Sequence, residues 1–508
     1  MKTLIRFLAV IAMGCLFVSP AWANEDPNFG KAYGPRFEPA TPLHWGLFHR
    51  PHRSGHGGIG LLRDWNTIAV NASGLDHTPV AQGELRVFGE QLGPARASRA
   101  MAIVHIAMFE ALNAIEGRYE SYVGMPPGNR SASAEAAIAQ AARDALVAMF
   151  PSQRLAFDAL LAEDLRDVRD GTAKSNGINI GKQAASLILA RRAHDGSAHS
   201  EERIGIEYVP GTAPGVWRQD PISQVPIALG SRWAEVAPFV MPGASAFRAP
   251  PPPALNSAAY ASAYAEAKRL GGDGIVTATE RTAEQTMVGT FWAYDGTPSL
   301  CAPPRLYNQI ARTIADRFRL DAGELARLLA LLNVAMADTG IAVWESKYFY
   351  KYWRPIGGIR ESDPGTGPSG LGDGNAATIG DRSFSPLGAP ASNLNGPNFT
   401  PPFPAYPSGH AGFGGALFHT LRLFFGSDRI PFTFVSDEFN GQTRDHNGIV
   451  RPYLPRTFST LGAAEEENGQ SRIYLGIHWS FDKTEGIAQG RRVAEHVFTH
   501  AFRPLRGR

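Results

Sequence analysis

Three short segments in the last third of the chain carry side chains that together suit one kind of chemistry. They supply three cations, two imidazoles, one carboxylate and a turn of small residues. In chain order these residues are Lys347, Arg354, Ser408, Gly409, His410, Arg472, His478 and Asp482. Cationic side chains and backbone N–H groups bind the oxygens of a tetrahedral anion, and an imidazole can approach its central atom. The combination therefore predicts an oxyanion site with two histidines.

The first two segments have spacings that a helical structure would use. Lys347 and Arg354 are seven residues apart, about two helical turns, so one helix face could present both. Because Pro355 disfavours the α conformation at Arg354, we expect the helix to end there with the guanidinium at its mouth. Ser408 and Gly409 precede an apolar run, and a helix starting there would direct free N–H groups at an anion.

The third segment pairs an imidazole with a carboxylate. His478 and Asp482 are four residues apart, on one face if helical. At that spacing Asp482 can accept the Nδ1–H of His478 and leave Nε2 free as a nucleophile or a ligand. Arg472 precedes His478 by six residues, which fits one helix face poorly, so we expect Arg472 on a loop or turn.

Each feature also has an explanation that needs no function. Lys347 and Arg354 could form a solvated helix end, and His410 could be a histidine at a helix start. His478 and Asp482 could make an ordinary surface contact. All three explanations would have to hold together at these spacings, so we favour a functional site.

The three segments resemble the signature of the vanadium-dependent haloperoxidases and the related type-2 phosphatidic acid phosphatases. Members of that superfamily bind vanadate or phosphate in the same site. The residues that the resemblance implies for binding the anion's oxygens are Lys347, Arg354, Ser408, Gly409 and Arg472.

The same resemblance implies a role for each histidine. His410 would be the acid–base residue, and His478 would coordinate vanadium, or attack phosphorus in a phosphatase. Lys347 would polarise bound peroxide, and Asp482 would hold His478 through its other ring nitrogen.

Three further residues resemble the chloroperoxidase branch of the family. Phe403 stands where many bromoperoxidases have a second histidine, and Trp344 lies one turn before Lys347, so both are implied to line a halide pocket. Asp295 is implied to be the carboxylate partner of an active-site arginine. A buried aromatic is usually core, and Asp before Gly is common in turns, so both interpretations stay open for these three residues.

The resemblance implies oxidation of bromide, and of chloride as a further halide, by hydrogen peroxide to hypohalous acid. The cofactor would be vanadate, with a peroxovanadate bound to His478. The alternative is an exported acid phosphatase with a phosphohistidine intermediate and phosphate in the same site. A third hypothesis is a non-catalytic oxyanion-binding protein, which would need neither histidine. The length of the chain and the aromatic pair favour the peroxidase, with peroxide, halide and an organic acceptor as partners.

Composition agrees with a large enzyme. The 508-residue chain is 44% hydrophobic and 19% charged, so it can bury an extensive core. Its net charge of +2 gives no electrostatic reason to expect nucleic acid as a partner. A homo-oligomer is compatible with this composition.

The N-terminus has the pattern of a signal peptide over residues 1–23. Lys2 and Arg6 precede an apolar run, and Ala21-Trp22-Ala23 offers a cleavage site. We therefore expect an exported protein, periplasmic or secreted, without a membrane span. The mature chain would keep one cysteine, Cys301, so it would have no intramolecular disulfide.

Apolar periodicity predicts an all-α protein of two helical bundles with long irregular loops. We expect an irregular N-terminal arm over 24–90, a first helical bundle and connector over 91–255, and a second bundle over 256–508 that contains the vanadate or phosphate site. A helix opened by the capping box Asp321…Glu324 should lead to the first motif. Residues 363–402 are rich in Gly and Pro and should form a loop that shapes the site.

Overall fold

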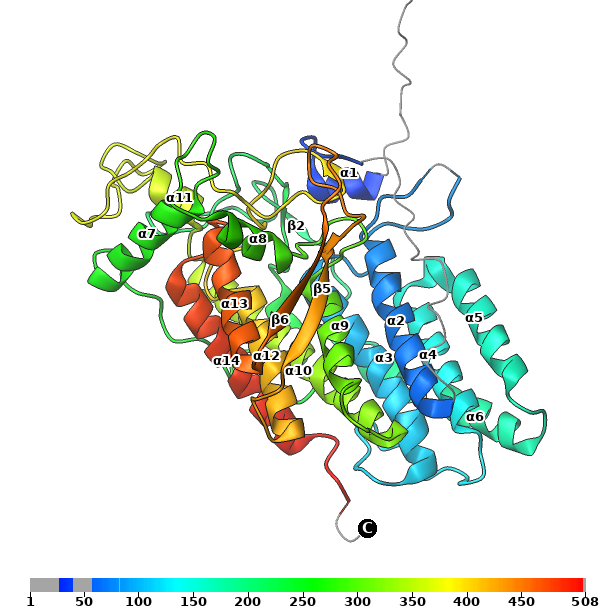
Figure 1. Cartoon of the computed structure of the whole chain (residues 1–508). Helices are drawn as coiled ribbons and strands as arrows, with labels where there is room; N and C mark the ends of the chain where they lie inside the picture. The colour runs from blue at the N-terminus through cyan, green and yellow to red at the C-terminus, as the bar shows by residue number, and fades with distance from the viewer. Residues whose placement is uncertain (1–26, 40–56, 82, 506–508) are drawn as a thin grey trace, which may run out of the picture.

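The computed structural model describes residues 27–39, 57–81 and 83–505. The expected signal peptide, residues 1–23, lies outside the described residues. The described chain is mainly helical, as expected, and its elements are arranged in two bundles joined by long loops (Figure 1).

The first bundle is built mainly from five helices of the N-terminal half. They are α2 (Gly57–Asp76), α3 (Gly93–Glu116), α4 (Ala134–Met149), α5 (Arg154–Asp167) and α6 (Thr172–Arg192). A short helix, α1 (Pro27–Tyr33), precedes them. A helical bundle was expected in this region, and its helices are present.

The expectation of an irregular arm over residues 24–90 is wrong where α2 forms. Leu62, Trp65, Ile68 and Ala72 recur at three- and four-residue spacing on this helix, and all four are buried. This stripe packs on α4 and on α9 (Pro303–Ala315). Glycines within and before the segment hid a helix whose formation depends on tertiary packing.

The second bundle contains the remaining helices. They are α7 (Ala258–Gly271), α8 (Ala283–Phe291), α9, α10 (Ala322–Tyr350), α11 (Pro355–Arg360), α12 (Gly409–Phe425), α13 (Leu461–Tyr474) and α14 (Ser480–His500). Asp321 caps α10 and forms the expected capping box with Glu324. Residues 363–402 are mainly loop, as predicted.

The described part of the chain also contains three small antiparallel sheets. The pairs are β1 (Glu38–Pro39) with β4 (Leu394–Asn395), β2 (Glu202–Arg203) with β3 (Ile227–Ala228), and β5 (Phe432–Asn440) with β6 (Tyr453–Phe458). Two short 3₁₀ turns, Pro151–Gln153 and Trp233–Glu235, complete the elements. The β5–β6 hairpin occupies the long stretch between the second and third motifs, where we expected no strand.

Helix α10 lies between the two bundles and contacts α3 on one side and α12 and α14 on the other (Figure 1). The largest apolar core runs continuously through these helices. By length and composition alone, α3 and α10 could cross a membrane, but their most apolar windows are 100% and 94% buried inside the protein. Both are therefore explained as core helices of a large bundle.

Helices α12 and α14 cross in very close contact because glycines face the crossing. A Cβ on Gly486 would lie 2.6 Å from the carbonyl O of Ser408, and a Cβ on Gly490 would overlap the carbonyl of Gly412. No side chain larger than hydrogen fits at either position. This contact brings the start of α12 next to the start of α14.

Candidate active site

The first motif, which contains Lys347 and Arg354, lies on two elements rather than on one helix face. Lys347 is in the last turn of α10, but the helix ends at Tyr350, and Lys351 has a left-handed backbone. Arg354 precedes α11 in an extended conformation (φ −78°, ψ 159°), as the following Pro355 requires. The expectation that one helix carries both cations is therefore wrong, because the chain turns between them.

Lys347 is fully buried at the C-terminal end of α10. Its Nζ donates to the carbonyl oxygens of Pro404 (2.8 Å) and Ala405 (2.9 Å). An ammonium group has three donors, so one remains for a further acceptor. The two carbonyls hold Lys347 against the segment that leads into the second motif.

Arg354 reaches the same place from the start of α11. Its Nε donates to the carbonyl O of Phe403 (2.9 Å), and its Nη1 donates to the carbonyl O of Ile477 (2.8 Å). Nη1 also lies 2.9 Å from Nε2 of His478. The guanidinium thus connects the second and third motifs.

The second motif starts helix α12. Ser408 is the N-cap and accepts from the backbone N–H of Ala411, as the predicted helix start requires. Gly409 is the first helical residue, and a Cβ there would lie 3.3 Å from the ring of Trp344. Glycine therefore allows the backbone to approach the aromatic ring and Lys347 closely.

His410, the second residue of α12, is buried. Its Nε2 makes a short hydrogen bond with the carbonyl O of Ala293 and lies 4.0 Å from Oδ1 of Asp295. Because a carbonyl can only accept, Nε2 carries the proton, and the neutral ring keeps its lone pair on Nδ1.

Arg472 lies in the last turn of α13 and not on a loop. The expectation was wrong because His478 is not on the same helix, so the spacing between the two residues sets no helical register. Arg472 Nη2 donates to Oδ1 of Asp295 at 2.6 Å. The structure thus brings together the cation and the carboxylate that the resemblance paired.

His478 lies in the turn before α14, and Asp482 is in the first turn of that helix. Nδ1 of His478 lies 2.7 Å from Oδ2 of Asp482, which also accepts from the backbone N–H of Trp479 (3.0 Å). The expected imidazole–carboxylate contact is present although only one partner is helical.

Several buried donors at this site have no acceptor among the described residues. They are Nη2 of Arg354 and both Nε and Nη1 of Arg472. Leaving buried guanidinium donors unpaired is costly, so such donors usually face a ligand or water. An oxyanion would accept from all three atoms at once.

The site opens onto a cavity whose empty space, together with the open solvent at its mouth, is about 720 Å³. Asp295, Gly409, His410, Arg472 and His478 line it, together with many apolar side chains. The cavity therefore gives small molecules access to the histidines and to the unpaired donors.

The aromatic pair also lines the cavity. The ring centroids of Trp344 and Phe403 are 4.9 Å apart. Nζ of Lys347 lies 5.1 Å from the centroid of Phe403, and the guanidinium of Arg354 lies 5.0 Å from it. The Phe403 ring therefore contacts both cations, in an arrangement where a cation attracts the ring's face.

Burial and mutual repulsion shift the pKa values of the clustered groups. Burial, followed by the charge of Arg354, lowers the pKa of His478 and that of Lys347 well below their usual values. Burial, followed by the charge of Arg472, lowers the pKa of His410 in the same way. Both imidazoles are therefore neutral at pH 7, and each has one unprotonated ring nitrogen.

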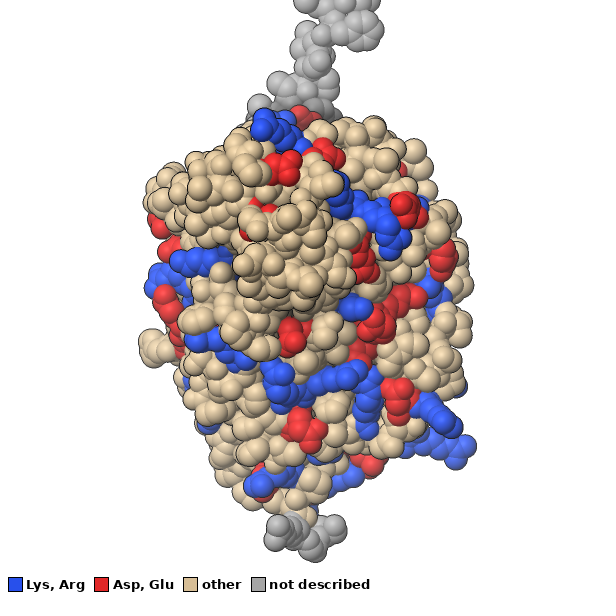
Figure 2. All heavy atoms as spheres, turned by 90° about the vertical axis from the view of Figure 1, so that its left-hand side faces the viewer, with Lys and Arg blue, Asp and Glu red and all other residues tan. Residues whose placement is uncertain are grey.

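The same effects act on the other charges of the site. Burial lowers the pKa of Arg354 to about 9 and raises the pKa of Asp482 to about 7. On the face shown in Figure 2, cationic and anionic side chains are interspersed. The cations around His478 are buried, and an anion there would stabilise their charged forms.

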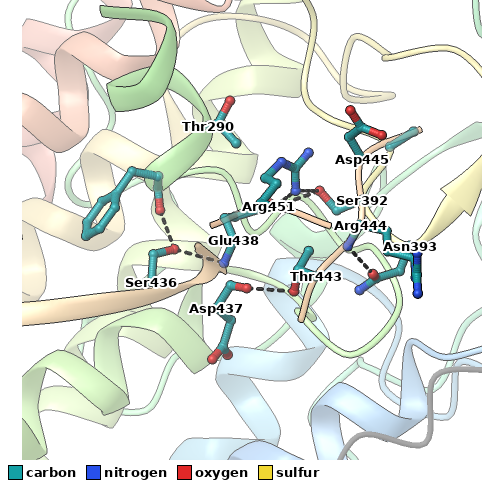
Figure 3. Close-up of polar contacts among 12 residues, drawn as sticks. Thr290, Ser392, Asn393, Ser436, Asp437, Glu438, Thr443, Arg444, Asp445 and Arg451 are labelled. Carbon is teal, nitrogen blue, oxygen red and sulfur yellow. Dashed lines mark hydrogen bonds and ion pairs between the residues drawn. The ribbon is translucent and has the colours of Figure 1, made fainter. Parts of the chain in front are cut away.

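The β5–β6 hairpin, which we did not predict, anchors the segment before α9 that carries Asp295. Ser436 Oγ donates to the carbonyl O of Phe291 (2.7 Å) and accepts from the backbone N–H of Glu438 (3.1 Å) (Figure 3). Tyr294 has φ +45°, which residues other than glycine rarely adopt, so this turn needs such anchors.

Glu438 is the most buried charge of the hairpin. Its Oε2 accepts from Ser392 (2.6 Å) and from Arg451 (2.6 Å), which joins the hairpin to the loop after α11 (Figure 3). The anchored segment supplies the carbonyl of Ala293 to His410 and the carboxylate of Asp295 to Arg472. The hairpin therefore positions two site residues from a distance.

Comparison with known proteins agrees with this architecture. Residues 327–507 match the family described as the VCPO second helical-bundle domain. Vanadium chloroperoxidase from Curvularia inaequalis is 37% identical over 273 residues, which cover 46% of this chain and 43% of that protein. The match thus spans less than half the length of that relative.

Solved structures share the fold over most of the chain. A bacterial vanadium-dependent iodoperoxidase superposes with a TM-score of 0.68 at 21% identity, covering 87% of this chain and 97% of its own. The holo form of a bacterial vanadium-dependent chloroperoxidase gives a TM-score of 0.60 at 17% identity, covering 89% and 97%.

The chain thus shares the fold of solved vanadium-dependent haloperoxidases, and its residues 327–507 match the VCPO second helical-bundle domain. The resemblance indicated by the motifs is confirmed.

Proposed function

We propose that the protein is a vanadium-dependent haloperoxidase, which oxidises bromide, and chloride as a further halide, with hydrogen peroxide. One observation carries the proposal: unpaired buried donors of Arg354 and Arg472 lie beside a neutral His478 at the end of a cavity. Such donors bind the oxygens of a tetrahedral anion, and an anion that accepted the Nη1–H of Arg354 would release the Nε2 lone pair of His478 for its central atom.

The residues present fit vanadate. Arg354, Arg472 and the third N–H of Lys347 would hold its oxygens, with help from Ser408 and the N–H of Gly409. Nε2 of His478 would bind its central atom. When bound, vanadate supplies a Lewis-acid centre at which peroxide becomes open to two-electron reduction by a halide.

The chain's own groups would then move protons and bind the halide. Neutral His410 would accept a proton from hydrogen peroxide and return it to the departing oxygen. Lys347 would polarise the bound peroxide through its remaining N–H. Trp344 and Phe403 would provide a weakly hydrated place for the halide next to the cations. Asp482 would keep the proton of His478 on Nδ1 throughout.

The same residues could serve a phosphatase, which is the second candidate. His478 is a neutral nucleophile held by Asp482, and His410 could protonate a leaving alcohol. The support for this candidate is that the unpaired donors would bind phosphate as well as vanadate.

Activity of the purified protein with and without orthovanadate separates the candidates. Vanadate-dependent bromination of monochlorodimedone with peroxide would support the haloperoxidase. Hydrolysis of p-nitrophenyl phosphate that vanadate inhibits would support the phosphatase. Neither activity, with tight vanadate binding retained, would leave an oxyanion-binding protein.

A further inference from the structure

A buried hydrogen-bond cluster beside His410 is not explained by anion binding. The backbone carbonyl O of His410 accepts from Nδ2 of Asn468 (2.9 Å), and the hydroxyl of Tyr307 lies 2.9 Å from the same oxygen. The Tyr307 hydroxyl also lies 3.0 Å from Oδ1 of Asn468. A carbonyl inside a helix ordinarily accepts only the N–H four residues further on, so these two donors are additional contacts.

Tyr307 and Asn468 come from two different helices. Tyr307 lies on α9 and Asn468 on α13, and both side chains are fully buried. A Cβ on Gly414 would overlap the amide of Asn468, so glycine at this position of α12 lets the amide reach the helix backbone. Burial raises the pKa of Tyr307, so its hydroxyl keeps its proton and remains a donor. The first turn of α12 is therefore held from two sides.

Asn468 connects His410 with the cation that α13 contributes to the site. Arg472 follows Asn468 by four residues, so both lie on one face of this helix. Arg472 Nη2 donates to Oδ1 of Asp295 (2.6 Å), and the segment that carries Asp295 offers the carbonyl of Ala293 to the ring of His410. These contacts form a closed circuit that holds His410 both by its backbone carbonyl and by its ring.

We propose that Tyr307 and Asn468 are positioning residues, which fix the distance between His410 and Arg472 and act on turnover through His410. An acid–base group must lie within hydrogen-bond reach of the proton that it moves, and a displacement of about 1 Å can cost about 100-fold in rate. This inference rests on the proposed haloperoxidase function, because that function gives His410 its acid–base role.

Tyr307→Phe removes the hydroxyl and keeps the shape of the ring. We expect the turnover of bromination to fall about tenfold, while the affinity for orthovanadate stays within about twofold of wild type, because no group that binds the anion is changed. Unchanged turnover would overturn the proposal. A fall in vanadate affinity as large as the fall in turnover would also overturn it, because Tyr307 would then act on the anion site or on the fold.

Tyr122→Phe is the matched control. The hydroxyl of Tyr122 also donates to a backbone carbonyl, that of Phe239 (2.8 Å), but Tyr122 lies in the loop after α3, outside the lining of the cavity. Its turnover and its affinity for orthovanadate should equal those of wild type at a temperature where both variants remain folded.

A double-mutant cycle tests whether Tyr307 acts through His410. His410→Ala removes the ring that Tyr307 is proposed to position, so adding Tyr307→Phe should change the residual turnover of His410→Ala by less than about twofold. A tenfold loss in both backgrounds would show that Tyr307 acts independently of His410 and would overturn the proposal.

Hydrogen exchange of the protein without vanadate tests the contact without any reaction. Backbone N–H groups over residues 408–413 should exchange at least about threefold faster in Tyr307→Phe and in Asn468→Ala than in wild type, and at the wild-type rate in Tyr122→Phe. Unchanged exchange in the first two variants would overturn the proposal. Faster exchange in a protein that brominates nothing would refute the haloperoxidase function and leave the positioning of His410 standing.

Discussion

Nη1 of Arg354 lies 2.9 Å from Nε2 of His478. A guanidinium can only donate, so Nε2 must accept and the ring proton must be on Nδ1, where Oδ2 of Asp482 receives it at 2.7 Å. His478 is therefore held in one neutral tautomer by a cation on one side and a carboxylate on the other. Its lone pair faces the cationic end of the cavity.

His478→Ala should weaken binding of orthovanadate by more than about 100-fold, because the central atom loses its protein ligand. Calorimetric titration of the purified variant would measure this. His419→Ala is the matched control, since His419 is a partly exposed histidine paired with Glu495 on the bundle surface. Undiminished binding by His478→Ala would contradict the assigned ligand.

His410→Ala should leave orthovanadate binding within a few-fold of wild type and lower turnover by about 100- to 10,000-fold, as expected for loss of an acid–base group. Steady-state bromination at saturating peroxide would measure the turnover. A large loss of vanadate binding with normal turnover per bound vanadate would reverse the roles given to His410 and His478.

The ionisation of Asp482 should make the free energy of unfolding depend on pH in a known direction. Burial raises its pKa to about 7 from 3.8, so the folded protein favours the protonated acid. The stability that this group contributes is therefore present at low pH and is lost as pH rises from about 4 to about 7. Urea unfolding across this range should show Asp482→Asn gaining stability relative to wild type as pH increases. A constant difference between the two proteins would contradict the shift.

The ionisation of Asp482 should also affect the binding of orthovanadate. Only ionised Asp482 can accept the Nδ1–H of His478 with full charge, so the affinity of the wild type for orthovanadate should rise through about pH 7. Asp482→Asn lacks this step, and the ratio of the two affinities at each pH cancels the titration of vanadate itself.

Glu438→Ala tests the hairpin. Removing this buried carboxylate leaves Arg451 and Ser392 without their acceptor and should cost about 3 kcal/mol of unfolding free energy. Glu120→Ala, which removes an exposed partner of Arg503, should cost at most about 1 kcal/mol.

Bromination by Glu438→Ala at a temperature where it remains folded should be slower, because the turn that holds Asp295 loses an anchor. Normal stability and normal turnover of Glu438→Ala would show that the hairpin does not position Asp295.

Much of the helical fold could be predicted because local signals and packing agree. The capping box at Asp321, the helix start at Gly409 and the loop over residues 363–402 all appear where the sequence indicated. The contact between Asp295 and Arg472 could be expected only from resemblance, because 177 residues separate them.

The features that the sequence did not reveal depend on contacts between residues that are far apart in the chain. Glu465 stands in a run of three glutamates, yet it is buried in α13 and pairs with Arg422 and Arg491. The hairpin did carry a signal: Phe432 and Phe434 alternate with exposed residues at a two-residue period. This alternating run is short and lies between two long helical regions, so the helical pattern dominated the prediction.

The glycine contact between α12 and α14 affects how mutational scans of this protein should be interpreted. His410 lies on α12, and His478 lies just before α14. A side chain at Gly486 or Gly490 would push these helices apart and so change the spacing between the two imidazoles. Inactive variants at these glycines would then resemble catalytic knockouts although they touch no reactant. Substitution libraries of this protein should therefore hold both positions constant and vary the residues that line the cavity.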